Sequence, residues 1–222
     1  MSQPLSTALL LRRHPERAMA DRAAAIAVLD EARVCHVGFV EDGRPWVIPT
    51  TYGRDGDLLY LHGAAVGRLM RTLTSGLDVC VTVTLLDGLV VARSAFAHSM
   101  NYRSVLVAGT AVEVVGVNAK LHALRCIVDH VLPGRWEEVR PPSSQELDAT
   151  SVLMLPLDNI SAKVRSGAPV DSKSDRALTL WAGDIPLRQV IGDPRPDGAA
   201  CASLPLPPSV VDLLDERVVP GP

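Results

Sequence analysis

Short apolar runs alternate with tight polar turns through the middle of the chain, from Val34 to about Val115. Three of these turns carry the dipeptide Asp-Gly, at Asp42-Gly43, Asp55-Gly56 and Asp87-Gly88. Asp-Gly between β-branched runs is a strong hairpin signal, because glycine tolerates the positive φ that a tight hairpin turn requires. We therefore predict three hairpins in an antiparallel sheet that closes into a barrel.

Apolar residues recur at helical spacing before, within and after this region. The helices that we predict cover residues 16–33, 66–75 and 118–131, with a short fourth helix after Pro141-Pro142. Ser143 and Glu146 form a capping-box pattern at the start of the fourth helix. An apolar run over residues 151–157 predicts a last long strand. The predicted class is mainly β with flanking helices.

The last part of the chain differs from the rest in composition. Eight of the 17 prolines follow Asp184, and little periodicity is present there apart from residues 210–214. We predict one domain over residues 1–187 and a Pro-rich extension over residues 188–222 that wraps a surface or a partner.

Charge and apolar content narrow the class of protein. Lys and Arg number 22 against 25 Asp and Glu, a net charge of −3, which argues against nucleic-acid binding. No apolar run reaches the roughly 18–20 residues of a membrane span, and the N-terminal order of charge and apolarity is the reverse of a secretory signal. We predict a cytoplasmic protein with reduced thiols and no metal site, because the cysteines lie far apart along the chain. They are Cys35, Cys80, Cys126 and Cys201.

The sequence lacks the motifs of the common enzyme classes. It contains no P-loop, no Gly-x-Gly-x-x-Gly after a strand, no Gly-x-Ser-x-Gly elbow and no His-Glu-x-x-His. Polar residues remain at the ends of predicted strands, in three segments.

The first segment is the strand Trp46–Tyr52, which contains Pro49. Proline cannot donate to a ladder, so it marks a sheet edge or a bulge. An edge strand can offer unpaired backbone groups to a planar heterocycle, and a plain edge strand is the alternative interpretation.

The second segment, Leu61–Arg68, leads from a strand into a helix through small residues. Arg68 falls in the first helical turn, where a cation is disfavoured unless it meets a bound anion such as a phosphate. His62 ends the strand and could donate a proton to a ligand. A solvent-facing Arg68 and a structural His62 are the alternatives.

In the third segment, polar side chains interrupt a strand pair built from Val, Ala and Leu. The segment contains no Gly or Pro, which a solvated loop would usually carry. A functional and a structural interpretation are both open. The polar residues are His98, Ser99, Asn101, Tyr102 and Arg103.

Taken in order, these segments resemble the FMN-binding split β-barrel proteins of the pyridoxamine 5′-phosphate oxidase-like superfamily, above all its nitroimidazole-resistance (Nim-like) branch. The resemblance covers about residues 11–187. It is carried by Arg12-Arg13 with Pro15-Glu16-Arg17, Gly43-Arg44-Pro45 with Pro49–Tyr52, Leu61-His62-Gly63 with Gly67-Arg68, Asn101–Val105, Lys163-Val164-Arg165 and Trp181–Pro186.

The resemblance implies an antiparallel split barrel that pairs into a homodimer, with FMN in clefts at the subunit interface. Strand 47–52 would face the flavin with its backbone, Arg68 would hold the phosphate, and His62 would be the catalytic residue. The basic pair at the phosphate is only half present, as Gly67-Arg68, and no residues for pyridoxamine phosphate are recognisable. The implied cofactor contacts are Val47, Ile48, Pro49, Thr50, Thr51, Tyr52, Leu61, His62, Gly67, Arg68, Asn101, Tyr102, Arg103 and Ser104.

We therefore expect a flavin-dependent oxidoreductase that acts on a small molecule, such as a nitro-aromatic electrophile, with a nicotinamide cofactor as reductant. A flavin would supply the redox chemistry, which accounts for the lack of a triad or metal motif. One alternative is a flavin-binding module without turnover. Another is a relative that holds haem or a deazaflavin in the same cleft, with His62 or His98 as a haem ligand. A purely structural dimer is the third.

Overall fold

The structure is a computed structural model that describes residues 15–19, 21–74 and 76–216. The Arg12-Arg13 pair of the resemblance lies outside these residues. The helices are α1 (Arg22–Glu31), α2 (Arg68–Thr74), α3 (Val117–Val131), α4 (Ser144–Ala149), α5 (Gly198–Ala202) and α6 (Pro208–Asp215), with 3-10 turns η2 (Pro15–Arg17), η3 (Ala95–Ala97), η4 (Arg135–Glu138) and η5 (Asp175–Ala177).

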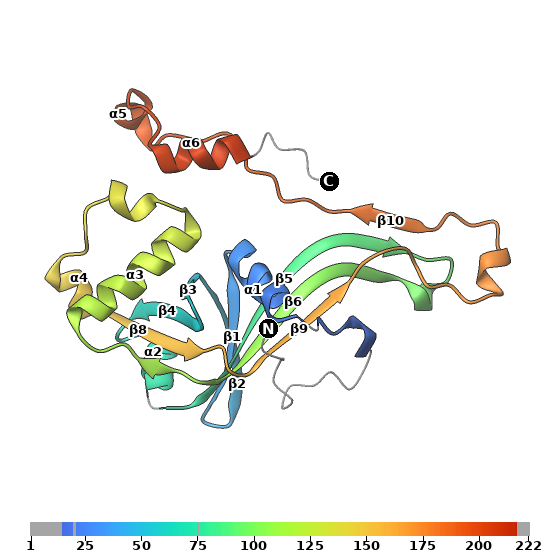
Figure 1. The fold of residues 1–222 in the computed structure, drawn as a ribbon, viewed down its shortest axis with the longest axis horizontal. Helices are drawn as coiled ribbons and strands as arrows, with labels where there is room; N and C mark the ends of the chain where they lie inside the picture. The colour runs from blue at the N-terminus through green and yellow to red at the C-terminus, as the bar shows by residue number, and fades with distance from the viewer. Residues whose placement is uncertain (1–14, 20, 75, 217–222) are drawn as a thin grey trace.

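In the described part of the chain, ten strands form two antiparallel sheets (Figure 1). The large sheet has the order β2-β1-β5-β6-β9, and β10 pairs with the part of β5 that extends beyond β1. The small sheet has the order β3-β4-β8-β7. The strands are β1 (Cys35–Glu41), β2 (Arg44–Thr50), β3 (Tyr52–Asp55), β4 (Leu58–Ala64), β5 (Asp78–Val91), β6 (Ser99–Thr110), β7 (Val112–Glu113), β8 (Thr150–Pro156), β9 (Ile160–Arg165) and β10 (Gly183–Pro186).

The main core lies between the two sheets. It joins Val37, Val81 and Val107 of the large sheet to Leu61 and Leu155 of the small sheet, with further residues from α1 and α2. The two sheets remain separate, so the barrel is split, as the resemblance implies, and the closed barrel expected from the hairpins alone is wrong.

Two of the three predicted Asp-Gly hairpins are confirmed, and the third is wrong. Asp42 and Gly43 both have positive φ, 50° and 73°, and Gly56 has φ 55°. Asp87-Gly88 instead lies inside β5, where the pairing with β6 shifts by a bulge. A Cβ on residue 88 would lie 3.0 Å from the carbonyl oxygen of Ile185 in β10. This glycine therefore permits close approach of a neighbouring strand in place of a turn.

The predicted helices are confirmed, with one change of boundary. Helix α1 begins at Arg22 and not near Glu16, because Asp21 caps it by accepting a hydrogen bond from the Ala23 N–H. The capping box of Ser143 and Glu146 is present at α4. No helix among the described residues is long and apolar enough to span a membrane.

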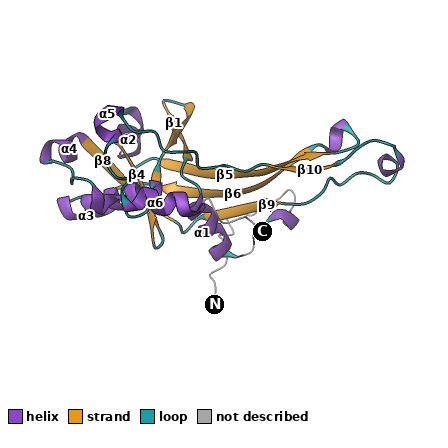
Figure 2. Cartoon of the chain, turned by 90° about the horizontal axis from the view of Figure 1, so that it is seen from above, coloured by secondary structure: helices purple, strands orange, loops and turns teal. Residues whose placement is uncertain are grey.

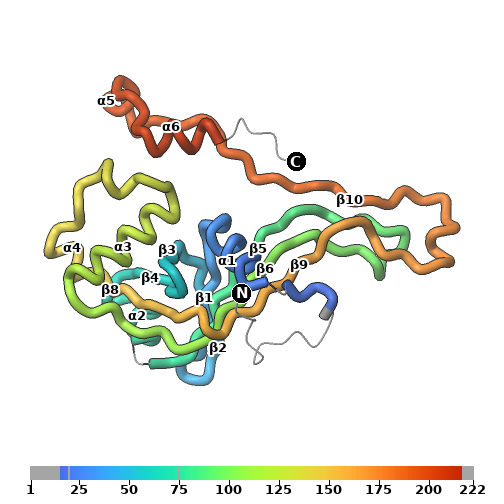
Figure 3. Tube along the Cα trace, viewed as in Figure 1, coloured from blue at the N-terminus to red at the C-terminus, as the bar shows by residue number. Residues whose placement is uncertain are grey.

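The C-terminal part is less extended than predicted. Figure 2 shows β5, β6 and β9 reaching out as a long arm, with β10 beside β5. Figure 3 traces the chain from β10 back to two short helices, α5 and α6. Helix α6 is anchored where the backbone N–H and the hydroxyl of Ser209 donate to the Glu138 carboxylate, at 2.8 and 2.5 Å.

Candidate functional site

The register of the large sheet places one row of residues on its outer face, away from the core. The row alternates with buried residues on every strand, as the two-residue period of a β-strand requires. Its side chains stay exposed or half-buried. From edge to edge the row contains Pro49, His36, Thr82, Leu106 and Ser161.

A groove of about 410 Å³ lies on this outer face, over β5, β6 and β9. Four hydroxyl groups and the ammonium group of Lys163 line it, and no acidic side chain is among its lining residues. This combination suits an anionic or hydrogen-bonding ligand. The lining residues are Thr82, Thr84, Ser104, Val105, Leu106, Ser161, Ala162 and Lys163.

Alternation along β6 divides the predicted site residues between the two faces. Ser104 and Tyr102 pair with Lys163 and Arg165, and both lie on the outer face with the groove. By the same alternation Arg103 lies on the opposite face. Asn101 is buried and contacts Arg165, the partner of Tyr102.

Arg103 joins two other elements through its guanidinium. It donates to both carboxylate oxygens of Asp87, at 2.8 and 3.0 Å, and to both oxygens of Glu31 in α1. These hydrogen bonds raise the pKa of Arg103. The buried Asn101 accepts from Arg165. The side chains of Asn101 and Arg103 are therefore committed within the described fold.

The predicted edge strand is present, since β2 pairs only with β1 among the described strands. Val47 and Pro49 lie on the outer face with the groove, whereas Ile48 packs against the core and Thr50 shares its face. Thr51 lies between β2 and β3. Their contacts with a cofactor remain predictions.

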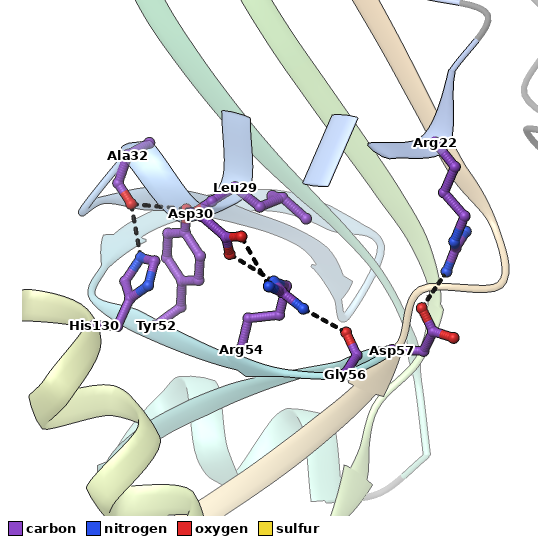
Figure 4. A network of polar contacts seen from close by, with 9 residues as sticks. All are labelled: Arg22, Leu29, Asp30, Ala32, Tyr52, Arg54, Gly56, Asp57 and His130. Atoms are coloured by element: carbon purple, nitrogen blue, oxygen red, sulfur yellow. Dashed lines mark hydrogen bonds and ion pairs between the residues drawn. The ribbon is translucent and has the colours of Figure 1, made fainter. Parts of the chain in front are cut away.

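Tyr52 has a fully buried side chain, so only its backbone could face a ligand. Its hydroxyl lies 2.5 Å from the Leu29 carbonyl and 2.9 Å from the Ala32 carbonyl (Figure 4). The Nε2 of His130 donates to the same Ala32 carbonyl at 2.7 Å. Burial raises the pKa of Tyr52. Its side chain fixes the end of α1 against β3.

Arg68 begins α2 beside Gly67 and lies against β1 and β2. Its guanidinium carbon is 4.0 Å from the ring centroid of Trp46, and its Nε is 3.3 Å from the Glu41 carboxylate. The Thr72 hydroxyl donates to the same carboxylate at 2.6 Å. A phosphate at Arg68 would compete with Glu41 for the guanidinium.

His62 lies on the small sheet, on the opposite face of β4 from the fully buried Leu61. It shares this face with Tyr60, which packs against α3. The Nδ1 of His62 is buried, and no hydrogen-bond partner for it is present among the described residues. Burial lowers the pKa of His62. Within one chain, the structure does not bring His62 and the groove together, because they lie on different sheets.

Most residues that line the groove were not predicted from the sequence as cofactor contacts. Thr82 and Thr84 alternate with buried valines, and Ser161 and Lys163 alternate in the same way on β9. That alternation was visible, but only the strand order shows that the two polar rows adjoin. Nothing in the local sequence marks Glu41 and Trp46 as partners of Arg68.

The family model described as pyridoxamine 5′-phosphate oxidase matches residues 21–164. The chain belongs to this family, and the resemblance found in the sequence is confirmed. Among curated proteins, no match was found.

Solved structures add three comparisons. The flavocytochrome Anf3 from Azotobacter vinelandii is 39% identical, with a TM-score of 0.87 over 93% of this chain and 96% of that one. An FAD- and heme-binding protein from Mycobacterium smegmatis is also 39% identical, with a TM-score of 0.83 over 88% and 96% of the two chains. A protein assigned to 5-nitroimidazole antibiotic resistance in Bacteroides thetaiotaomicron is 26% identical, with a TM-score of 0.57 over 66% and 86%.

Proposed function

We propose that the protein is a flavin-binding redox protein whose flavin lies along the outer face of the large sheet. The observation that carries the proposal is the groove with four hydroxyls, Lys163 and no acidic lining residue. A lysine ammonium is a usual phosphate contact, and hydroxyls can satisfy the polar edge of a ring or a ribityl chain. The exposed edge strand β2 lies on the same sheet and can offer backbone groups.

A bound flavin supplies hydride or single-electron transfer, and the protein supplies placement, hydrogen bonds and control of solvent. The residues of the groove would orient the flavin rather than react with it. His62 is proposed as the proton donor to a small-molecule substrate, since its buried Nδ1 lacks a partner among the described residues. A nicotinamide cofactor is proposed as reductant.

For the cofactor, we propose FAD together with haem ahead of the FMN that the sequence suggested. Two proteins at 39% identity are a flavocytochrome and an FAD- and heme-binding protein, which supports this choice. A haem needs an axial ligand, and this cannot be His62 if His62 donates the proton. His98 can supply this ligand, because its Nδ1 is engaged by the Ser94 carbonyl at 2.9 Å and no hydrogen-bond partner for its Nε2 is present among the described residues.

We also propose that two copies of the chain pair through the outer face of the large sheet. On this face Val47 is 65% exposed and Leu86 is 47% exposed. A second copy would cover these side chains and complete the cofactor cleft, as expected of an interface that buries more than about 2,000 Å². A monomeric mass in solution with flavin still bound would contradict this arrangement.

The test is the absorption spectrum of the purified full-length protein, followed by chromatography of the cofactor released on denaturation. A flavin spectrum with FAD released is expected, with a haem band beside it. Release of FMN alone would restore the sequence prediction. No flavin spectrum, even after addition of FAD or FMN, would overturn the proposal.

Lys163→Ala tests the position of the flavin. Loss of one charge-assisted contact is expected to weaken flavin affinity by about 10- to 100-fold. Lys173→Ala, at an exposed position outside the groove, is the matched control and should bind normally. Equal affinities for the two variants would show that the flavin does not contact Lys163.

A further inference from the structure

A second hollow lies on the other side of the molecule, where α3 crosses the end of β3. It has a volume of about 510 Å³ and is lined by Arg54, Asp55, His122, Arg125, Cys126, Asp129 and His130. None of these residues belongs to the flavin groove or to the sequence-predicted site. The hollow therefore carries chemistry that the proposed function does not use.

Three of its side chains bring metal-ligating atoms together. The Nε2 of His122 lies 2.9 Å from Oδ2 of Asp55 and 3.7 Å from Sγ of Cys126. All three ligand atoms lie within 4.8 Å of one another. In a tetrahedral zinc site, ligand atoms at bond lengths of about 2.0–2.3 Å stand roughly 3.3–3.6 Å apart. The separation of His122 from Asp55 is slightly shorter than this range, and its separation from Cys126 is slightly longer.

The backbone holds His122 and Cys126 close to Asp55. His122 and Cys126 are four residues apart on α3, so they lie on one face of the helix. Gly53 in β3 lets this helix approach the strand, because a Cβ there would lie 2.6 Å from the backbone of Cys126 and Ile127. The helix thus rests directly on the strand that ends at Asp55.

Neighbouring charges leave the three ligands available to a cation. Arg54 is held by Asp30, at 2.6 and 2.8 Å (Figure 4). Arg125 is held by Asp129 and Glu137, at 3.4 and 2.8 Å. Both positive side chains of the hollow are therefore balanced by carboxylates of their own.

We propose that Asp55, His122 and Cys126 form a binding site for a divalent transition-metal ion of the Zn²⁺ type. Sulfur, imidazole and carboxylate are the ligand types that Zn²⁺ takes, and a water would complete the fourth position, since Asp55 and His122 are exposed. Binding replaces the thiol proton of Cys126. From the sequence we expected no metal site because the cysteines lie far apart. A site with a single cysteine cannot be found from cysteine spacing.

The test is equilibrium dialysis of the purified full-length protein against Zn²⁺, with metal content measured by emission spectrometry. One Zn²⁺ per chain is expected. Cys126→Ser and His122→Ala should each weaken binding by at least about 100-fold, beyond the roughly 10- to 100-fold loss typical of outer-shell partners. X-ray absorption at the zinc edge should show one sulfur neighbour in the wild type and none in Cys126→Ser.

The matched control is Cys201→Ser, which changes an exposed cysteine outside the hollow. It should bind Zn²⁺ as the wild type does. Circular dichroism without metal would establish that all variants fold, as expected from the exposed or half-buried ligands. Equal binding by Cys126→Ser and Cys201→Ser, or no binding by the wild type, would overturn the proposal. Neither result would affect the flavin proposal, whose readout is the cofactor spectrum.

Discussion

The two sheets of the split barrel each turn one face to the common core, but their outer faces differ. Helix α3 covers the small sheet, where Tyr60 and Val152 join Ala123 and Ile127 in a second apolar cluster. The outer face of the large sheet stays exposed or half-buried among the described residues and carries hydroxyls and Lys163. The covered face is built for stability, and the uncovered face offers polar groups to a ligand or a second chain. This difference predicts that substitutions on the two faces will have separable effects.

His62 lies on the covered side and is still proposed to act on substrate, so its substitution tests whether the two faces have separate roles. His62→Ala should keep the fold and the flavin and should lower turnover by about 10²- to 10⁴-fold, the usual contribution of a general acid–base group. Single-turnover kinetics, flavin content and melting temperature would be measured on one preparation. Normal turnover with a lowered melting temperature would assign His62 to the structural side.

Substitution of Arg68 tests whether a second cation contacts the phosphate. Arg68→Ala should weaken binding of a phosphate-bearing flavin by about 1.5–3 kcal/mol, or roughly 10- to 100-fold, if the phosphate displaces Glu41. Riboflavin, which lacks the phosphate, should bind both proteins alike. Arg71→Ala, exposed on the same helix, is the control.

Flavin titrations of the two variants would separate two arrangements. Weaker binding only in Lys163→Ala would place the phosphate in the groove and leave Arg68 in its contacts with Trp46 and Glu41. Equal losses for riboflavin and for the phosphate-bearing flavin would show that Arg68 does not contact the phosphate.

Gly53 tests the covered face. Gly53→Ala should lower the free energy of unfolding by about 1–3 kcal/mol, because the new Cβ would meet the backbone of α3 at 2.6 Å and the helix would have to move. Flavin affinity should stay unchanged. Denaturant unfolding would be compared with Gly192→Ala, a position with open space around it. A change in flavin affinity as large as the change in stability would show that the two faces are coupled.

Much of the fold could be predicted from local sequence patterns. Asp-Gly turns with positive φ are determined by their own residues, and so is the capping box at Ser143. Asp87-Gly88 has the same local pattern as the other two, but long-range pairing with β6 and β10 keeps it inside a strand. Its outcome depends on residues far away in sequence, which a local signal cannot report.

The candidate site was predictable only in part, for the same physical reason. The edge strand with Pro49 follows from one residue that cannot donate to a ladder. The groove arises from the order of β5, β6 and β9, and the metal-ligand cluster from contact between α3 and β3. The groove and the cluster each bring together residues that lie far apart along the chain, so the sequence does not show that they are close in space. Ion pairing of Arg103 with Glu31 was equally invisible from the sequence.

His62 should also make the stability of the protein depend weakly on pH. Burial lowers its pKa below the ordinary value of 6.5, so below pH 6.5 the unfolded chain binds a proton at this residue before the folded chain does. The neutral, buried His62 therefore contributes its full share of the free energy of unfolding above pH 6.5. This share is lost as the pH falls toward the pKa of His62 in the folded state, with a slope of at most about 1.4 kcal/mol per pH unit. His62→Gln removes the titrating ring, so the free energy of unfolding should fall less steeply between pH 7 and about pH 5. Parallel curves of unfolding free energy against pH for His62→Gln and the wild type would show that His62 takes up protons equally in the folded and unfolded states. Such a result would place the His62 ring in contact with water rather than in the buried position beside the small sheet.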